Sequence, residues 1–222
     1  MQMAEPSRFG IKIHNKIMTA LLATTYFGPI QWYQKLNRYG TVFIENHENF
    51  QKQTYRSRCV IATANGAQTL SVPITPIETA DGRTEAIVSD HGNWRHVHWN
   101  ALKSAYGESP FFEYYADDIY PFFRDKWEKL FDFNLAICRK ICELLDIEPD
   151  IRLTDNFLTQ EEARQAGIDD FRQTINPKNP APDTDFIPRQ YYQVYAGRNG
   201  FLPNMSVLDL LFNMGNESVL WL

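Results

Sequence analysis

Three of the five histidines in this sequence, His91, His96 and His98, lie close together in a polar and aromatic segment. We expect that segment to join a short strand to a helix. Strand ends and helix N-termini in α/β proteins present unpaired N–H groups, and ligands often bind there. The sequence therefore places Asn93 and Trp94, at the start of the expected helix, among the residues that contact a substrate.

His98 is the candidate general base. Trp94, His98, Leu102 and Tyr106 recur every four residues, so they share one face of the expected helix, and we expect that face to pack on the sheet. The alternative is a hydrogen-bonded core histidine without a catalytic role. A zinc site is not expected, because His96 and His98 on one helix point about 200° apart. No cofactor follows from these residues.

Two further groups of polar residues are candidates for binding a phosphate or a carboxylate. Lys52, Arg56 and Arg58 lead into an apolar run, and in an extended strand Arg56 and Arg58 project from the same face. The alternative is an ordinary exposed face of the sheet. Tyr26 and Lys35 flank a turn after the first expected strand, although no glycine-rich phosphate loop accompanies them.

The strands and helices that we expect to position these residues add up to an α/β fold. The fold begins with a β-α-β unit, continues with an antiparallel hairpin around Asn65-Gly66, packs helices on a mixed sheet, and docks a C-terminal helix on the body. Expected strands cover residues 21–26, 41–45, 55–64, 68–75, 85–89 and 151–154, a loop covers 76–84, and expected helices cover 29–40, 94–106, 120–145 and the stretch between Ser206 and Gly215.

We expect residues 1–17 to be an N-terminal extension and residues 18–222 to form a single domain, with a proline-rich, extended connector at 176–188. The net charge of −5 excludes a protein that mainly binds nucleic acid, because such binding needs a basic face. No apolar run approaches the length of a membrane span. We expect the three cysteines to be reduced and buried, which favours a cytoplasmic location. The sequence is compatible with a monomer or a homo-oligomer.

At these residues the sequence resembles the WbqC-like family of bacterial proteins from about Met18 onward. The resemblance rests on the family's strand end, its aromatic pair and lysine, its Lys-x-Ser-type motif with a later Leu-Thr-Val-Pro, and its Trp-x-x-x-His-x-x-x-Ile-x-x-x-Tyr helix. These are matched by Tyr26; by Trp32, Tyr33 and Lys35; by Phe50, Lys52, Thr54, Tyr55, Ser57, Arg58 and residues 70–73; and by Trp94, His98, Leu102 and Tyr106. The family's His-Gln-Pro start is replaced by Leu22-Ala23-Thr24.

The resemblance implies a role in surface-polysaccharide biosynthesis, such as that of O-antigen or lipopolysaccharide. Our first hypothesis is a transferase that modifies an activated or amino sugar, such as a nucleotide sugar, with His98 as the base and Arg58 and Lys52 holding a phosphate. The first alternative is a nucleotidyltransferase-like protein that binds a nucleotide at residues 26–35. The second is a non-catalytic binding or assembly protein with an aromatic partner surface at residues 191–195 and in the tail.

Overall fold

The computed structural model describes residues 18–222, so the expected N-terminal extension at 1–17 lies outside the described residues. A four-stranded sheet consists of β1 (Thr19–Leu22), β2 (Thr41–Ile44), β7 (Ile151–Leu153) and β8 (Asp169–Asp170), in the order β7-β2-β1-β8. Every neighbouring pair in it is parallel. Helix α1 (Ile30–Arg38) joins β1 to β2, which confirms the predicted β-α-β unit.

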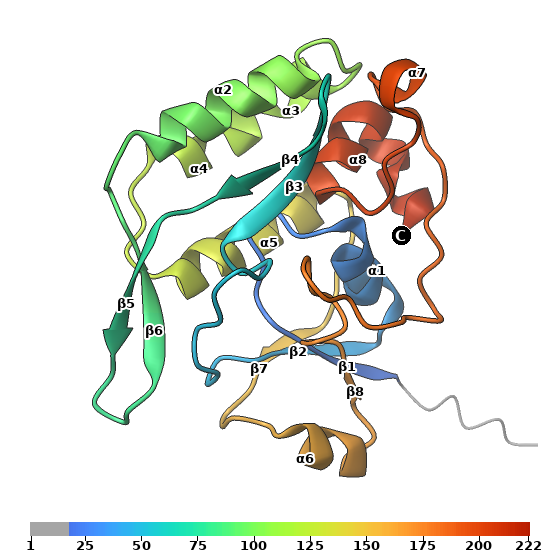
Figure 1. Cartoon of the computed structure of the whole chain (residues 1–222). Helices are drawn as coiled ribbons and strands as arrows, with labels where there is room; N and C mark the ends of the chain where they lie inside the picture. Colours follow the sequence, from blue (N-terminus) through green and yellow to red (C-terminus); the bar gives the residue numbers. More distant parts are fainter. Residues whose placement is uncertain (1–17) are drawn as a thin grey trace, which may run out of the picture.

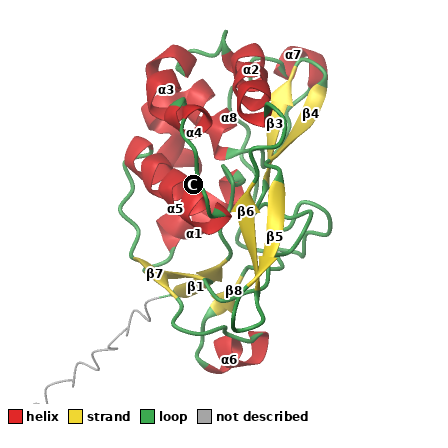
Figure 2. Ribbon diagram, turned by 90° about the vertical axis from the view of Figure 1, so that its left-hand side faces the viewer, coloured by secondary structure: helices red, strands yellow, loops and turns green. Residues whose placement is uncertain are grey.

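The central strands of this sheet are covered on both faces. Helix α1 lies on one side and α6 (Gln160–Gln165) on the other (Figures 1 and 2). Ala20, Leu21 and Leu22 are fully buried, as expected of a parallel strand that faces protein on both sides. Strand β1 ends at Leu22, so Tyr26, which we had placed in the strand, lies in the loop at the carboxyl end of the sheet.

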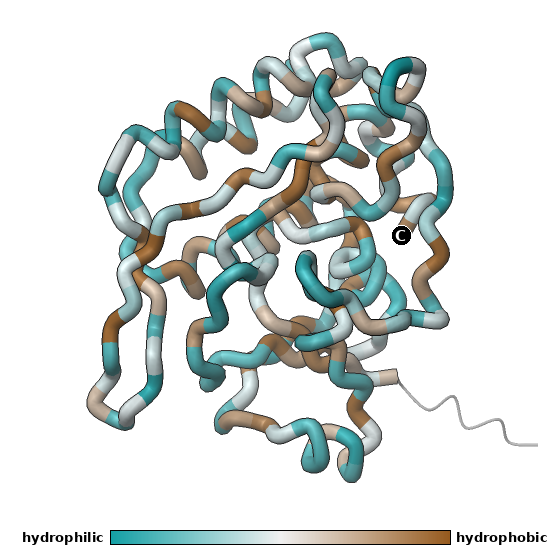
Figure 3. Tube along the Cα trace, viewed as in Figure 1, coloured by the Kyte–Doolittle hydropathy of each residue, from teal (hydrophilic) through white to brown (hydrophobic). Residues whose placement is uncertain are grey.

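The predicted hairpin around Asn65-Gly66 is confirmed. It pairs β3 (Arg58–Thr63) with β4 (Gly66–Ser71), and Gly66 has a positive φ of 96°, which a tight turn of this kind requires. Strand β3, with a hydrophobic stretch coloured brown in Figure 3, contributes the buried Cys59 and Ile61.

A second hairpin was not predicted. Strands β5 (Ile74–Glu78) and β6 (Thr84–Val88) pair in antiparallel register, with Pro76 opposite Ala86. The loop predicted over residues 76–84, on the ground that this segment is polar, is therefore wrong at both of its ends. Pro76 is tolerated here because the two strands form a sheet of their own, in which both are edge strands.

The predicted helix at 94–106 is confirmed as α2 (Trp94–Tyr106), and α3 (Phe112–Ile119) follows it. The single helix predicted over 120–145 is wrong, because two helices, α4 (Pro121–Arg124) and α5 (Leu130–Leu144), occupy that range. The chain between them is extended, and the carbonyl of Glu128 accepts a hydrogen bond from the N–H of Val88 at 2.8 Å. A tertiary hydrogen bond to the second hairpin thus replaces the helical one.

The C-terminal part contains α7 (Ala196–Asn199), α8 (Val207–Met214) and the 3₁₀ helix η1 (Gly215–Trp221). The predicted boundaries of α8 are confirmed, since the Ser206 hydroxyl accepts a hydrogen bond from the N–H of Leu208 and Gly215 has a positive φ of 58°. Helix α8 packs in the core of the body, as predicted. Within residues 18–222, no helix combines the length and apolar character that crossing a bilayer requires.

Candidate functional site

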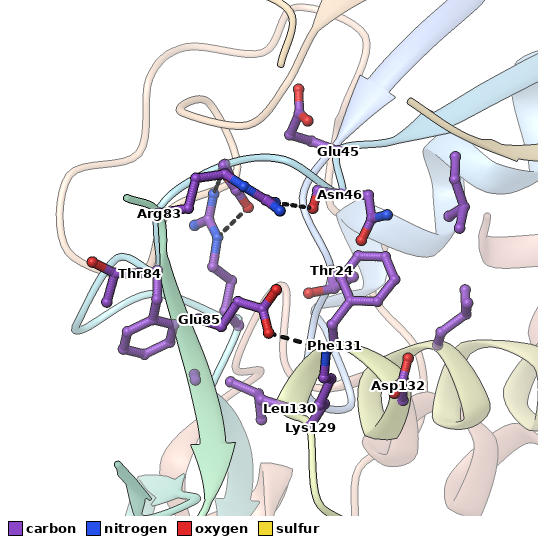
Figure 4. Close-up of a pocket in the computed structure, with 16 residues that line it drawn as sticks. Thr24, Glu45, Asn46, Arg83, Thr84, Glu85, Lys129, Leu130, Phe131 and Asp132 are labelled. Carbon is purple, nitrogen blue, oxygen red and sulfur yellow. Dashed lines mark hydrogen bonds and ion pairs between the residues drawn. The ribbon is translucent and has the colours of Figure 1, made fainter. Parts of the chain in front are cut away.

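A cavity of about 380 Å³ opens at the carboxyl end of the parallel sheet (Figure 4). Three strands contribute to it: Thr24 follows β1, Glu45 and Asn46 follow β2, and Leu153 ends β7. The remaining walls are Glu48, Phe50 and Arg56 from the next loop, Arg83, Thr84, Glu85 and Ala86 from the second hairpin, and Lys129, Leu130, Phe131, Asp132 and Leu135 from the start of α5. Ligands of open α/β proteins bind at this edge of the sheet.

Glu45 holds this edge together. Its side chain is fully buried and accepts hydrogen bonds from the Thr154 hydroxyl and the His47 N–H, both at 2.8 Å, from the Leu158 N–H at 3.1 Å, and from Arg172 at 3.0 Å. These partners follow β2, β7 and β8, so one carboxylate fixes the ends of three strands. Because all of its acceptor sites are engaged, Glu45 positions the cavity wall and does not bind a ligand.

The cations of the cavity wall are already paired. Arg56 is buried and donates two hydrogen bonds to Glu48, one of them at 2.6 Å. Lys129 pairs with Glu85 at 3.1 Å. Arg83 pairs with Asp81 at 2.6 Å. A phosphate would have to replace a carboxylate partner at one of these cations, and the replacement is costly at the buried Arg56, whereas the pairs of Lys129 and Arg83 are partly exposed.

Several polar groups of the wall face solvent without an ion partner in the described part of the chain. Asp132 stands in the first turn of α5, is exposed, and forms no salt bridge among residues 18–222. The hydroxyl of Thr84 and the amide of Asn46 add neutral donors and acceptors. Residues 18–222 do not bring together three His, Cys, Asp or Glu side chains in a way that would hold a metal ion.

His98 and Tyr26 lie apart from this cavity, in the core. The Tyr26 hydroxyl and Nδ1 of His98 are 2.9 Å apart, Tyr26 is fully buried, and 5% of His98 is exposed. Burial lowers the pKa of His98 to about 4, so the ring is neutral at physiological pH. The structure therefore favours the alternative interpretation of His98 as a hydrogen-bonded core histidine.

Residues 24–178 match the model of the WbqC-like protein family. The chain belongs to the WbqC-like family. All residues that line the cavity fall within the matched range, so the cavity is built from the part of the chain that defines the family. An uncharacterized protein of Mycobacterium tuberculosis, Rv1507c, is 26% identical to this WbqC-like chain over 191 residues, which cover 76% of this chain and 81% of that protein. No solved structure matches the chain.

The three cations that we expected to bind a phosphate do not converge in this WbqC-like protein. Strand β3 begins at Arg58, and Arg56 lies in the preceding turn, where it pairs with Glu48. The alternation that would place both guanidinium groups on one face is therefore absent, and that expectation is wrong. The Lys52 side chain is exposed in the loop before them, and neither Lys52 nor Arg58 lines the cavity.

Lys35 is also committed to an internal partner. Its side chain is 1% exposed, pairs with Asp183 at 2.8 Å, and stands 4.6 Å above the ring of Phe171. Gln31 donates a second hydrogen bond to Asp183 at 2.8 Å. Burial alone would raise the pKa of Asp183, but the hydrogen bonds from Lys35 and Gln31 lower it. Asp183 belongs to the predicted connector at 176–188, which these bonds tie to α1.

The strand-to-helix junction carries two predicted binding residues, one exposed and one buried. Asn93 precedes α2, but its side chain makes no capping hydrogen bond and is exposed. Trp94 is buried, and its indole N–H donates to the carbonyl of Ser89 at 2.9 Å. Neither residue lines the cavity of this WbqC-like protein, so a role for either in binding is still a prediction.

Of the residues that the sequence predicted for a site, Arg56 lines the cavity, whereas the other residues of the cavity wall were not predicted. The polar run at 45–48 follows the second strand of the β-α-β unit directly, and the rule that ligands bind at carboxyl ends of parallel strands would have found it. Lys129 and Asp132 were hidden inside the expected helix at 120–145. Thr84 and Glu85 could not be placed, because the second hairpin was not predicted.

Proposed function

We propose that this protein is an enzyme of bacterial surface-polysaccharide biosynthesis that transfers a group onto an amino or hydroxyl group of a sugar. The cavity at the carboxyl end of the sheet would bind the acceptor. The observation that carries the proposal is the composition of this wall, in which carboxylate, hydroxyl and amide groups stand beside the rings of Phe50 and Phe131. Such groups suit the hydroxyls and the C–H faces of a sugar ring.

The charges of the wall favour an amino sugar over a phosphate-rich ligand. Of the four carboxylates of the wall, Glu48 and Glu85 pair with Arg56 and Lys129, and Glu45 pairs with Arg172, which leaves Asp132 as the additional negative charge. We assign the contact with the amino group to Asp132, since this carboxylate has no ion partner within residues 18–222. In the reaction the amine nitrogen would form a bond to the transferred group, the bond between that group and its donor would break, and the donor would leave with the electron pair. Asp132 would accept the proton that the amine loses. This role replaces the one we first gave to His98, which is buried away from the cavity.

The nucleotide-binding alternative receives no support from residues 26–35, because Lys35, the cation of this segment, is buried against Asp183. Both the nucleotide alternative and the sugar proposal assign a small-molecule ligand to this protein. We propose a cytoplasmic location on the basis of three buried cysteines that form no disulfide.

One observation favours the non-catalytic alternative. An open groove of about 360 Å³ between α3 and η1 is lined by aromatic and polar residues, and Tyr114 on its wall is 71% exposed. Exposed tyrosines of this kind are common at protein interfaces. In the stretch at 191–195, where we first expected such a surface, Tyr191 is buried but Tyr192 is 56% exposed, so a partner surface there is still a prediction beside the groove on α3.

The experiment is a binding titration of glucosamine, glucose and ATP by calorimetry, repeated on Asp132→Asn. We expect glucosamine to bind and Asp132→Asn to weaken it about tenfold, since a charge-assisted hydrogen bond contributes about 1.5 kcal/mol or more. Asp117→Asn is the matched control, because Asp117 is an exposed helical aspartate outside the cavity. Absence of sugar binding at millimolar concentration, or equal binding by Asp132→Asn, contradicts the proposal, and binding of ATP alone supports the nucleotide alternative.

A further inference from the structure

A second depression adjoins the cavity and runs along α5. It measures about 460 Å³ and lies between α5 and the segment that ends in β7. Leu135 and Leu153 line both the cavity and this groove, so the two spaces meet at these side chains. The remaining groove residues are Arg139, Cys142, Glu143, Ile147, Glu148, Pro149 and Ile151.

The floor of the groove is an apolar strip. On α5, Leu135 and Cys142 are seven residues apart, so they lie along one face of the helix, and Phe131 of the cavity wall continues that face four residues earlier. On β7, Ile151 and Leu153 alternate with Arg152 and therefore share the opposite wall. From Leu135 to Cys142 the strip is about 10 Å long, as given by the helical rise. Leu153 is 41% exposed, so the strip faces solvent.

We infer that the ligand of the cavity is amphipathic and that it carries an aliphatic chain that lies in this groove. For the polar end of the ligand the inference rests on the proposed function. A chain attached to a sugar in the cavity would pass over Leu135 and Leu153 directly onto the apolar strip, because these residues belong to both spaces. Full burial of each CH₂ on such a strip is favourable by the hydrophobic effect.

Two features favour an aliphatic chain over a protein segment. Strand β7 has only 3 residues, which gives an added peptide strand little to pair with. The strip is one side chain wide on each wall, whereas a stable protein interface covers about 800 Å² on each partner. The charged side chains of Arg139 and Glu148 stand exposed along the groove, where water would solvate them beside a bound chain.

The test compares the methyl, butyl and octyl glycosides of glucosamine by calorimetry, below their micellar concentrations. We expect affinity to rise about twofold for each added CH₂, because a half-exposed groove yields about half the gain of full burial. The octyl glycoside would then bind about 100-fold more tightly than the methyl glycoside.

Two variants test whether the gain in affinity from the longer alkyl chain arises in the groove. Ile151→Thr removes apolar surface, and Arg139→Trp fills the groove from an exposed helical position and is therefore expected to fold. We expect each to reduce the advantage of the octyl glycoside at least fivefold and to leave methyl glycoside binding unchanged. Arg152→Thr, on the other face of the same strand, is the control.

The outcomes separate this inference from the proposed function. Binding of the methyl glycoside with no gain from the longer chains overturns the inference and leaves the sugar proposal standing. If both groove variants show the same gain in affinity with chain length as the unmodified protein, the inference is also overturned. Binding of an octyl chain on a polyethylene glycol head, as tight as that of the glycoside, supports the groove and contradicts the sugar proposal.

Discussion

Replacing Glu45 by Gln is the sharpest test of how the carboxyl end of the sheet is built. A glutamine keeps the shape of the side chain and one acceptor oxygen, which can still serve His47 and Thr154. Its NH₂ group, however, replaces the oxygen that accepts from the Leu158 N–H and from Arg172. Two buried donors would then face a third donor, and the ion pair with Arg172 would be lost.

The expected cost is about 4 kcal/mol, within the range for removing one member of a buried ion pair. In a chain of this size that corresponds to a loss of about 10 °C in Tm. The assay is urea unfolding followed by tryptophan fluorescence. Glu143→Gln, at an exposed glutamate on α5, is the control and should cost less than about 0.5 kcal/mol. If Glu45→Gln lowers the free energy of unfolding by less than about 1 kcal/mol, Glu45 does not hold the ends of the three strands together.

Three further predictions concern buried titratable groups. Burial lowers the pKa of His98 to about 4, so the folded state holds its ring neutral, and this contribution to stability is fully present above about pH 6.5. As the pH falls toward 4, up to about 3 kcal/mol of the free energy of unfolding is lost. His98→Gln should therefore flatten this part of a curve of unfolding free energy against pH. Burial raises the pKa of Asp209 despite the hydrogen bonds from Tyr191 and Gln193, so the folded state favours the protonated carboxyl. The contribution of Asp209 to folding stability is therefore fully present only below the ordinary carboxyl pKa, and it is lost as the pH rises through the raised pKa. Unfolding measurements should therefore show Asp209→Asn losing this dependence; an unchanged slope would contradict it. Asp183→Ala leaves Lys35 buried without its partner, which should cost about 3 kcal/mol and make residues 176–188 the first site of limited proteolysis; unchanged cleavage would show that the ion pair does not hold the connector.

The local signals in the sequence were sufficient where neighbouring residues decide the structure. The β-α-β unit, the Asn65-Gly66 hairpin, α2 and the two ends of α8 were all predicted, because strand periodicity, turn chemistry and capping act over a few residues. The break between α4 and α5 was missed because a hydrogen bond from the distant Val88 stabilises it. No pattern near residue 125 indicates such a partner.

The sequence by itself determined the family, the α/β class and the placement of the principal elements. It also showed that His98 shares a helix face with Trp94 and predicted that this face packs on a sheet, and Tyr106 of that face does contact β3, where its hydroxyl accepts a hydrogen bond from the Ala62 N–H. Only the tertiary structure decided which polar residues form a site. It buried His98 against Tyr26, paired Lys35 with Asp183 and Arg56 with Glu48, and brought Thr24, Asn46, Thr84 and Asp132 to one cavity. The physical reason is that an ionisable side chain acquires its role from partners far away along the chain, and those partners meet only when the sheet and helices pack.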